Sequence, residues 1–112
     1  MSPITTHVLD VSLGRPAAGV PVLLEMQDGA GWAVMGRGVT DADGRNKTLM
    51  EPGTLAAGVY RLTFDTGVYF KIAKVTGFYP SVCITFEVHK AGEHYHVPLL
   101  LSPFGYSTYR GS

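Results

Sequence analysis

Short clusters of glycine and proline recur about every ten residues along the chain, and this spacing limits the possible folds more than any other feature. Fourteen glycines and seven prolines are spread over 112 residues instead of being gathered in one linker. Short segments bounded by such turn clusters are typical of all-β folds. The spacing therefore predicts a β-sandwich or a β-barrel.

The segments between the clusters alternate hydrophobic and polar residues with a period of two, as a strand with one buried face does. In the segment 82–88, Val82 and Ile84 lie on one side, whereas Cys83 and Thr85 lie on the other. We predict seven or eight strands on this pattern. They cover 20–26, 60–64, 82–88 and the segments near Ile4–Leu13, Trp32–Thr40, His94–Leu101 and Tyr106–Arg110, with a short eighth strand near Leu49.

One segment departs from the alternation, because its hydrophobic residues are spaced by three and four. This spacing predicts one short helix near 66–76, with Thr66 as its N-cap and Gly77 as its terminator. The spaced residues are Val68, Tyr69, Ile72 and Val75.

The charge of the chain argues against a polyanionic partner. Nine basic residues balance nine acidic ones, so the formal net charge is zero, and neither nucleic acid nor an anionic membrane is the expected partner. Charged residues make up only 16% of the chain, below the usual share of about a quarter. We therefore expect more of the surface than usual to be buried between chains.

Chain length and cysteine content indicate the number of domains and the absence of an intramolecular disulfide. A chain of 112 residues has room for one core, so we expect a single domain over residues 1–112. The only cysteine, Cys83, cannot form an intramolecular disulfide, and without an activating base nearby it is a small filler residue. The sequence shows no secretory leader and no run of about 18 apolar residues. We expect a cytoplasmic protein.

The strand predicted near 94–101 is apolar on both faces towards its end. In a sandwich the opposing sheet covers only the inner face, so a second copy of the chain is the simplest cover for the outer one. Parity places His96 on that outer face. If the neighbouring strands are those at the two ends of the chain, His7, Ser107 and Tyr109 lie on the same surface.

Two histidines on one surface suggest acid–base chemistry. An imidazole with a pKa near 6.5 takes or gives a proton at neutral pH, so His7 and His96 could activate a water. Arg45 follows an Asp-Gly turn and would be displayed at the rim of the sheet. The alternative is that both histidines are hydrogen-bonded strand residues at an interface and that Arg45 is a solvated loop residue.

Metal binding is the weaker interpretation of these residues. His94 and His96 share a strand face and could form a three-histidine zinc site with His7. No carboxylate is placed to orient such ligands, so we expect no metal. Asp41 and Asp43 hint at a calcium loop, but the glycine comes too early and the twelfth position is not acidic.

Several stretches together carry a family resemblance. They are Thr5–Asp10, Asp43–Arg45, His96–Pro103 and Tyr106–Ser112, of which the tetrapeptide Tyr109–Ser112 is the most specific. The chain resembles, over its whole length, the transthyretin-related proteins that act as 5-hydroxyisourate hydrolases. The resemblance implies a transthyretin-like two-sheet β-sandwich with one short helix, assembled as a homotetramer (a dimer of dimers) that encloses a channel.

The resemblance also implies a reaction in the conversion of urate to allantoin. Water opens the six-membered ring of 5-hydroxyisourate and gives 5-hydroxy-2-oxo-4-ureido-2,5-dihydro-1H-imidazole-5-carboxylate, without a cofactor. Two other functions stay open: a transthyretin-like carrier that binds a flat apolar ligand in the channel, and a purely structural sandwich. The residues that the resemblance assigns are His7, Arg45, His96 and Ser112 as catalytic and Ser107, Tyr109 and Arg110 as substrate-binding.

Overall fold

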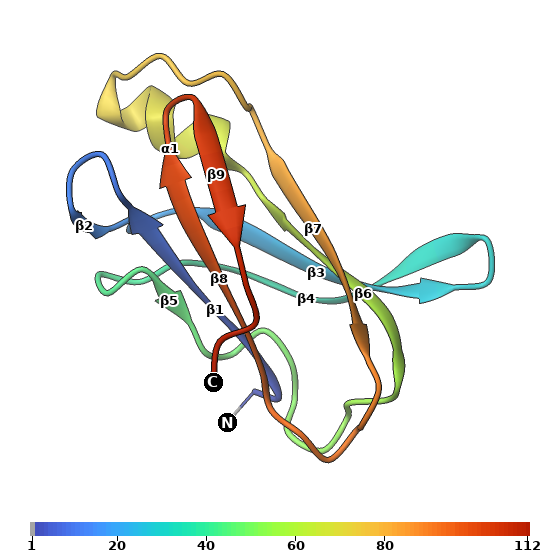
Figure 1. Cartoon of the computed structure of the whole chain (residues 1–112). Coiled ribbons are helices and arrows are strands. Elements are labelled where there is room, and N and C mark those ends of the chain that lie inside the picture. The colour runs from blue at the N-terminus through green and yellow to red at the C-terminus, as the bar shows by residue number, and fades with distance from the viewer. Residues whose placement is uncertain (1) are drawn as a thin grey trace.

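The computed structural model describes residues 2–112, which form two β-sheets packed face to face with one short helix at one end (Figure 1). One sheet has the order β2-β1-β8-β9, with β5 also paired to β1, and the other has the order β4-β3-β6-β7. The elements are β1 (Ile4–Asp10), β2 (Arg15–Pro16), β3 (Pro21–Asp28), β4 (Gly31–Val39), β5 (Arg45–Asn46), β6 (Gly58–Phe64), α1 (Thr66–Ala73), β7 (Val82–Val88), β8 (Tyr95–Ser102) and β9 (Gly105–Thr108).

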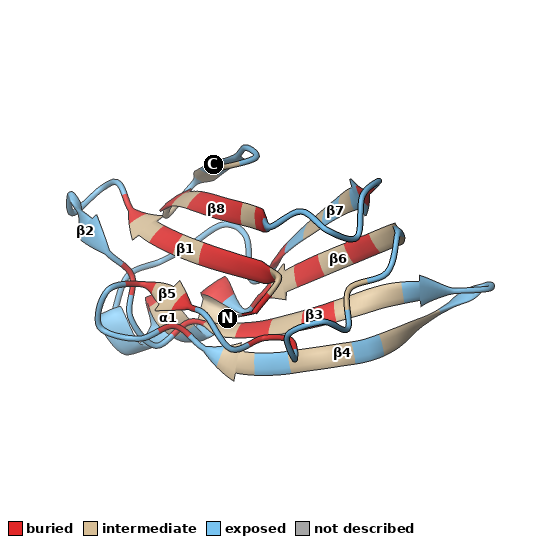
Figure 2. Cartoon of the chain, turned by 90° about the horizontal axis from the view of Figure 1, so that it is seen from below, coloured by how far each residue is buried: buried red, intermediate tan, exposed pale blue. Residues whose placement is uncertain are grey.

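The hydrophobic core lies between the two sheets, where buried residues alternate with more exposed ones along much of β1, β3, β6 and β8 (Figure 2). On β8, for example, Tyr95, Val97 and Leu99 are buried, whereas His96 is only half-buried. This alternation confirms the all-β sandwich that the sequence predicts. The largest fully buried side chains are Tyr60, Phe64, Ile4, Leu24, Leu49, Leu62, Leu99 and Leu101.

Two short strands escaped the sequence prediction, and one predicted strand is absent. The two-residue strands β2 and β5 are too short to show any alternation, so only their pairing with β1 reveals them. Residues 47–57 form no strand. Leu49 is nevertheless buried, and its backbone carbonyl packs so closely over Gly36 that a Cβ there would overlap it. Leu49 is therefore a hydrophobic loop residue that packs into the core, not part of a strand.

The helix is present and begins at Thr66, but its predicted N-cap and its predicted C-terminal end were wrong. The side chain of Asp65 accepts a hydrogen bond from the backbone N–H of Val68 and so caps α1, whereas the hydroxyl of Thr66 donates to the carbonyl of Tyr79. The helix ends at Ala73, because Lys74 adopts the left-handed conformation (φ 58°). In the part of the chain that the structure describes, no helix is long and apolar enough to cross a membrane.

The capping assignment predicts which of the two residues stabilises the start of α1. Replacing Asp65 by alanine removes the acceptor for the first-turn N–H and should lower the free energy of unfolding by about 1 kcal/mol. Urea unfolding measures this change, with Glu51→Ala, an exposed loop carboxylate, as the control. An unchanged midpoint in Asp65→Ala would show that the carboxylate does not cap the helix.

Candidate active site

Strand pairing in the five-stranded sheet gathers residues from three distant parts of the sequence. The parallel pairing of β1 with β8 sets Thr5 opposite His96 and His7 opposite Pro98. The antiparallel pairing of β1 with β5 sets Arg45 opposite His7. Because side chains alternate between the faces of a strand, all of these residues lie on the outer face of the sheet, away from the core.

The loop before Arg45 is fixed by backbone hydrogen bonds. A carboxylate oxygen of Asp41 accepts the backbone N–H groups of Asp43 and Arg45 at 2.9 and 3.0 Å. Gly44 has φ +75°, and a Cβ there would lie 2.3 Å from the carbonyl oxygen of Val8. The acidic residues that suggested a calcium loop therefore belong to a tight turn that holds Arg45 against β1.

The C-terminal residues return to β8 and lie over His96. The backbone N–H of Gly111 donates to the carbonyl of His96 at 2.8 Å and forms an isolated bridge with it. A Cβ at Gly111 would lie 2.6 Å from the imidazole carbon Cδ2 of His96, so only glycine fits this approach. The contact brings Ser112 to the rim of the same surface.

A small cavity opens on this face, with a volume of about 170 Å³. Cavities for drug-sized ligands measure about 300–1,000 Å³, so this one fits a small ligand or part of a shared site. It is lined by Thr5, Thr6, Arg45, Lys47, His94, His96 and Ser112.

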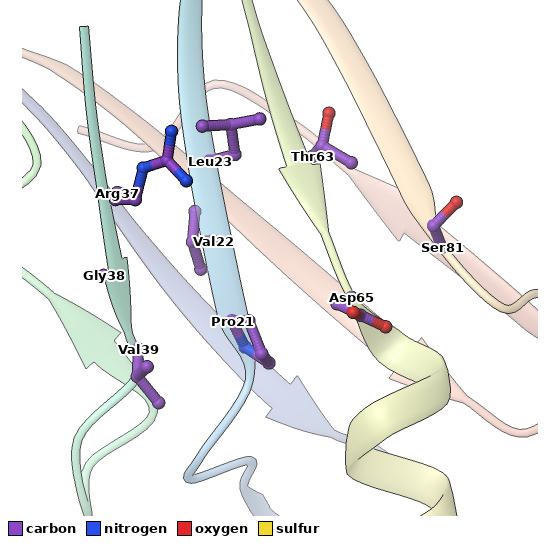
Figure 3. Close-up of a pocket in the computed structure, with 9 residues that line it drawn as sticks. All are labelled: Pro21, Val22, Leu23, Arg37, Gly38, Val39, Thr63, Asp65 and Ser81. Atoms are coloured by element: carbon purple, nitrogen blue, oxygen red, sulfur yellow. The ribbon is translucent and has the colours of Figure 1, made fainter. Parts of the chain in front are cut away.

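A larger hollow of about 490 Å³ lies on the other sheet, over β3, β4 and β6 (Figure 3). Its lining is mainly aliphatic and glycine, and its charged residues are Arg37 and Asp65. Asp65 already caps α1. The hollow offers no imidazole, so the smaller cavity is the better candidate for acid–base chemistry.

Burial and a neighbouring cation keep the two histidines neutral at pH 7. Burial, followed by the positive charge of Arg45, lowers the pKa of His7, whereas a hydrogen bond with the backbone of Asp43 and the charges of Asp41 and Asp43 offset part of this effect. Burial is also the main cause that lowers the pKa of His96, followed by the charges of Arg45, His7 and His94. Both imidazoles are thus available as proton acceptors close to a fixed positive charge.

The structure brings together some of the residues singled out from the sequence and separates others. Arg45, His96 and Ser112 line the cavity, and His7 stands beside Arg45 on the same face. Ser107 lies opposite Leu100, further along β8.

Two of the residues assigned to substrate binding lie around another hollow. Tyr109 and Arg110 line a groove next to β7. The guanidinium of Arg110 contacts Glu93 at 3.2 Å and stacks 4.4 Å from the ring centre of Tyr95. In this chain Arg110 therefore points to the rim of the sandwich.

Four residues that line the cavity were not assigned to it from the sequence: Thr5, Thr6, Lys47 and His94. Thr5 carried no assignment, although its parity with His7 on one strand could have indicated it. Lys47 follows Arg45 by two residues and lies on the same side of the chain. His94 was considered only as a zinc ligand. No group of three or more potential metal ligands gathers among residues 2–112.

A two-sheet sandwich with a small cavity, lined by imidazole and guanidinium groups on the outer face of one sheet, defines a transthyretin-like protein. Comparisons with known proteins agree. The model of the HIUase/Transthyretin family matches residues 4–111. The chain belongs to this family.

Both 5-hydroxyisourate hydrolases and transthyretins are similar to this chain. A 5-hydroxyisourate hydrolase of Salmonella typhimurium is 49% identical over 109 residues, which are 97% of this chain and 80% of that protein. The structure of Klebsiella pneumoniae 5-hydroxyisourate hydrolase is 38% identical with a TM-score of 0.84, covering 97% and 98% of the two chains. Sea bream transthyretin in complex with thyroxine is 36% identical with a TM-score of 0.92, covering 97% and 94%.

The electrostatic argument predicts the titration of both histidines. Imidazole proton shifts in NMR should titrate below pH 6.5 for His7 and His96. Arg45→Met removes a cation that disfavours the imidazolium form, so both pKa values should rise. Arg37→Met, on the other sheet, is the control and should leave them unchanged. Unaltered titration in Arg45→Met would refute the coupling.

Proposed function

We propose that this chain is a 5-hydroxyisourate hydrolase whose site is the cavity on the outer face of the β1–β8 sheet. The observation that carries the proposal is the pairing of neutral His96 and His7 with Arg45 in a chain so similar, over nearly its full length, to proteins named 5-hydroxyisourate hydrolase. The product is 5-hydroxy-2-oxo-4-ureido-2,5-dihydro-1H-imidazole-5-carboxylate. Residues 1–112 constitute one transthyretin-like hydrolase domain, and its location is the cytoplasm.

The chemistry that the site supports is attack by water on a ring carbonyl. A neutral imidazole of His96 or His7 takes one proton from the water as its oxygen bonds to the carbonyl carbon. The carbonyl oxygen becomes negatively charged, and the guanidinium of Arg45 stabilises it. The ring carbon–nitrogen bond then breaks, and the proton passes from the imidazolium to the departing nitrogen. The step needs no cofactor and no nucleophilic side chain.

The remaining assigned residues complete the pocket around the substrate. Ser112 reaches the cavity through the close contact of Gly111 with His96, so its hydroxyl can donate to a polar substrate. Ser107 extends the same outer face further along β8, because it pairs with Leu100, whereas Tyr109 would contact substrate from the neighbouring groove next to β7. Arg110 supports the site indirectly by holding the backbone carbonyl of His94 at 3.4 Å.

The carrier function fits the cavity less well. A carrier for a flat apolar ligand needs a lining of aliphatic groups that exclude water. Here the cavity contains two imidazoles, a guanidinium and an ammonium group. Burying those groups against an apolar ligand would leave them without partners, at a cost in free energy. The polar lining therefore favours hydrolysis over carriage.

The proposed enzyme is a homotetramer, a dimer of dimers, with its small-molecule substrate bound between subunits. Strands β7 and β9 are both edge strands of their sheets, so their outer backbone groups can pair with a second copy. The groove next to them measures about 380 Å³ and contains Ile84 and Phe86. A second dimer over the outer face of β1 and β8 would roof the small cavity.

Substitution of the histidines tests the proposed chemistry. His7→Asn and His96→Asn remove the proton acceptor but keep a polar side chain, so the hydrolysis rate should fall by about 10²-fold or more. The measurement is the decay of absorbance of freshly made 5-hydroxyisourate, with and without protein. The oligomeric state of each variant, by light scattering, is the control. Near-normal turnover by both variants would refute the catalytic assignment.

Dilution tests whether the site is shared between subunits. If a sister chain roofs the cavity, activity per chain should fall as the tetramer dissociates, while the far-ultraviolet signal of β-structure persists. Light scattering at the same concentrations gives the population of each oligomer. Monomers with full activity per chain would show that one chain contains the whole site.

A further inference from the structure

A threonine hydroxyl joins two histidines at the edge of the cavity. The hydroxyl oxygen of Thr5 lies 2.8 Å from Nδ1 of His96 and 3.1 Å from Nε2 of His94. The two imidazole rings are nearly parallel, with centroids 6.4 Å apart. Thr5 is only 5% exposed and is paired with His96 in the sheet, so its hydroxyl has little freedom to move elsewhere.

The two histidines compete for the single hydroxyl proton of Thr5. A threonine hydroxyl has one proton to donate and can accept from other donors. It can therefore donate to His94 or to His96, but not to both. Whichever ring does not receive that proton must donate its own N–H to Thr5. When the hydroxyl donates to one of the two rings, the other ring must therefore carry its proton on the nitrogen that faces Thr5.

Only one of the two arrangements leaves His96 with a free base. When Thr5 donates to Nε2 of His94, Nδ1 of His96 carries the proton and donates to Thr5, so Nε2 of His96 has its lone pair available. When Nε2 of His94 donates instead, Thr5 donates to Nδ1 of His96. Neutral His96 then carries its proton on Nε2 and cannot accept one from water there.

We propose that His94 is a positioning residue for the hydrolysis: by accepting the hydroxyl proton of Thr5, it fixes the tautomer in which His96 offers Nε2 as the base. This inference rests on the proposed function of the cavity. His94 does not touch the reacting atoms in this role and acts only through Thr5.

The residues around His94, Thr5 and His96 support this role. Arg110 bonds to the backbone carbonyl of His94 and to the carboxylate of Glu93, which holds the segment before β8 in place. The charged or titratable groups facing His94 and His96 from the other strands are the cations Arg45 and Lys47 and the imidazole of His7. A lowered pKa keeps His96 neutral, and only a neutral imidazole has a tautomer to select.

Removing His94 should affect the rate more than substrate binding. In His94→Phe the hydroxyl of Thr5 loses its acceptor and turns to Nδ1 of His96, which favours the unproductive tautomer. We expect kcat to fall about tenfold, the equilibrium effect of a single hydrogen bond, with KM within about twofold of the original value. Gln27→Phe, at an exposed position on the other sheet, is the control and should retain full activity.

A double-mutant cycle separates this role from a purely structural one. Thr5→Val removes the hydroxyl but keeps the shape of the side chain, so adding His94→Phe to it should cause no further loss of kcat. Thr5→Ser keeps the hydroxyl and should restore sensitivity to His94→Phe. An unchanged kcat in His94→Phe, or an equal loss with and without the hydroxyl of Thr5, would overturn the proposal.

A second readout does not depend on the substrate. Nitrogen NMR shifts of His96 distinguish the two tautomers, and the proton should lie on Nδ1 in the original chain and on Nε2 in His94→Phe. The same tautomer in both proteins would overturn the proposal. If the tautomer changes as expected but the original chain does not hydrolyse 5-hydroxyisourate, the proposed function fails and the coupling between the histidines stands.

Discussion

The parallel pairing of the first strand with the eighth is the interaction on which the candidate site depends. Thr5 and His96 are separated by 91 residues in the sequence, yet the register between β1 and β8 sets them side by side. The hydroxyl of Thr6 reinforces that register by donating to the carbonyl of Val97 at 2.6 Å. A shift by one residue would turn His7 into the core and Val8 out to solvent.

The surrounding structure determines the charge and protonation of the side chains on this outer face. The turn before Arg45 places a guanidinium next to His7, and the C-terminal residues cover one edge of the ring of His96. Positive charge and partial burial both disfavour the imidazolium form, so the histidines remain neutral where a base is needed. The same guanidinium can stabilise the anion that forms on a carbonyl oxygen.

The same sandwich can support either a carrier or an enzyme, because the fold itself uses only the inner faces of its sheets. The core residues of β1 and β8 alternate with the outward residues that line the cavity. Outward positions can therefore change chemistry without disturbing the core. The chain is accordingly similar both to a 5-hydroxyisourate hydrolase and to a transthyretin in complex with thyroxine.

The amino-acid sequence by itself determined the longer strands, their buried faces and the outward parity of His7 and His96, because alternation is a local property of a strand; it missed the two-residue strands β2 and β5. It misplaced the N-cap of α1, since Asp65 and Thr66 are both good caps and only the position of Tyr79 decides between them. Tertiary structure alone decided that Arg45 lies opposite His7, that Arg110 points towards Glu93, and that Thr5 joins His94 to His96. These facts depend on strand register and on contacts between distant residues, which no local pattern encodes.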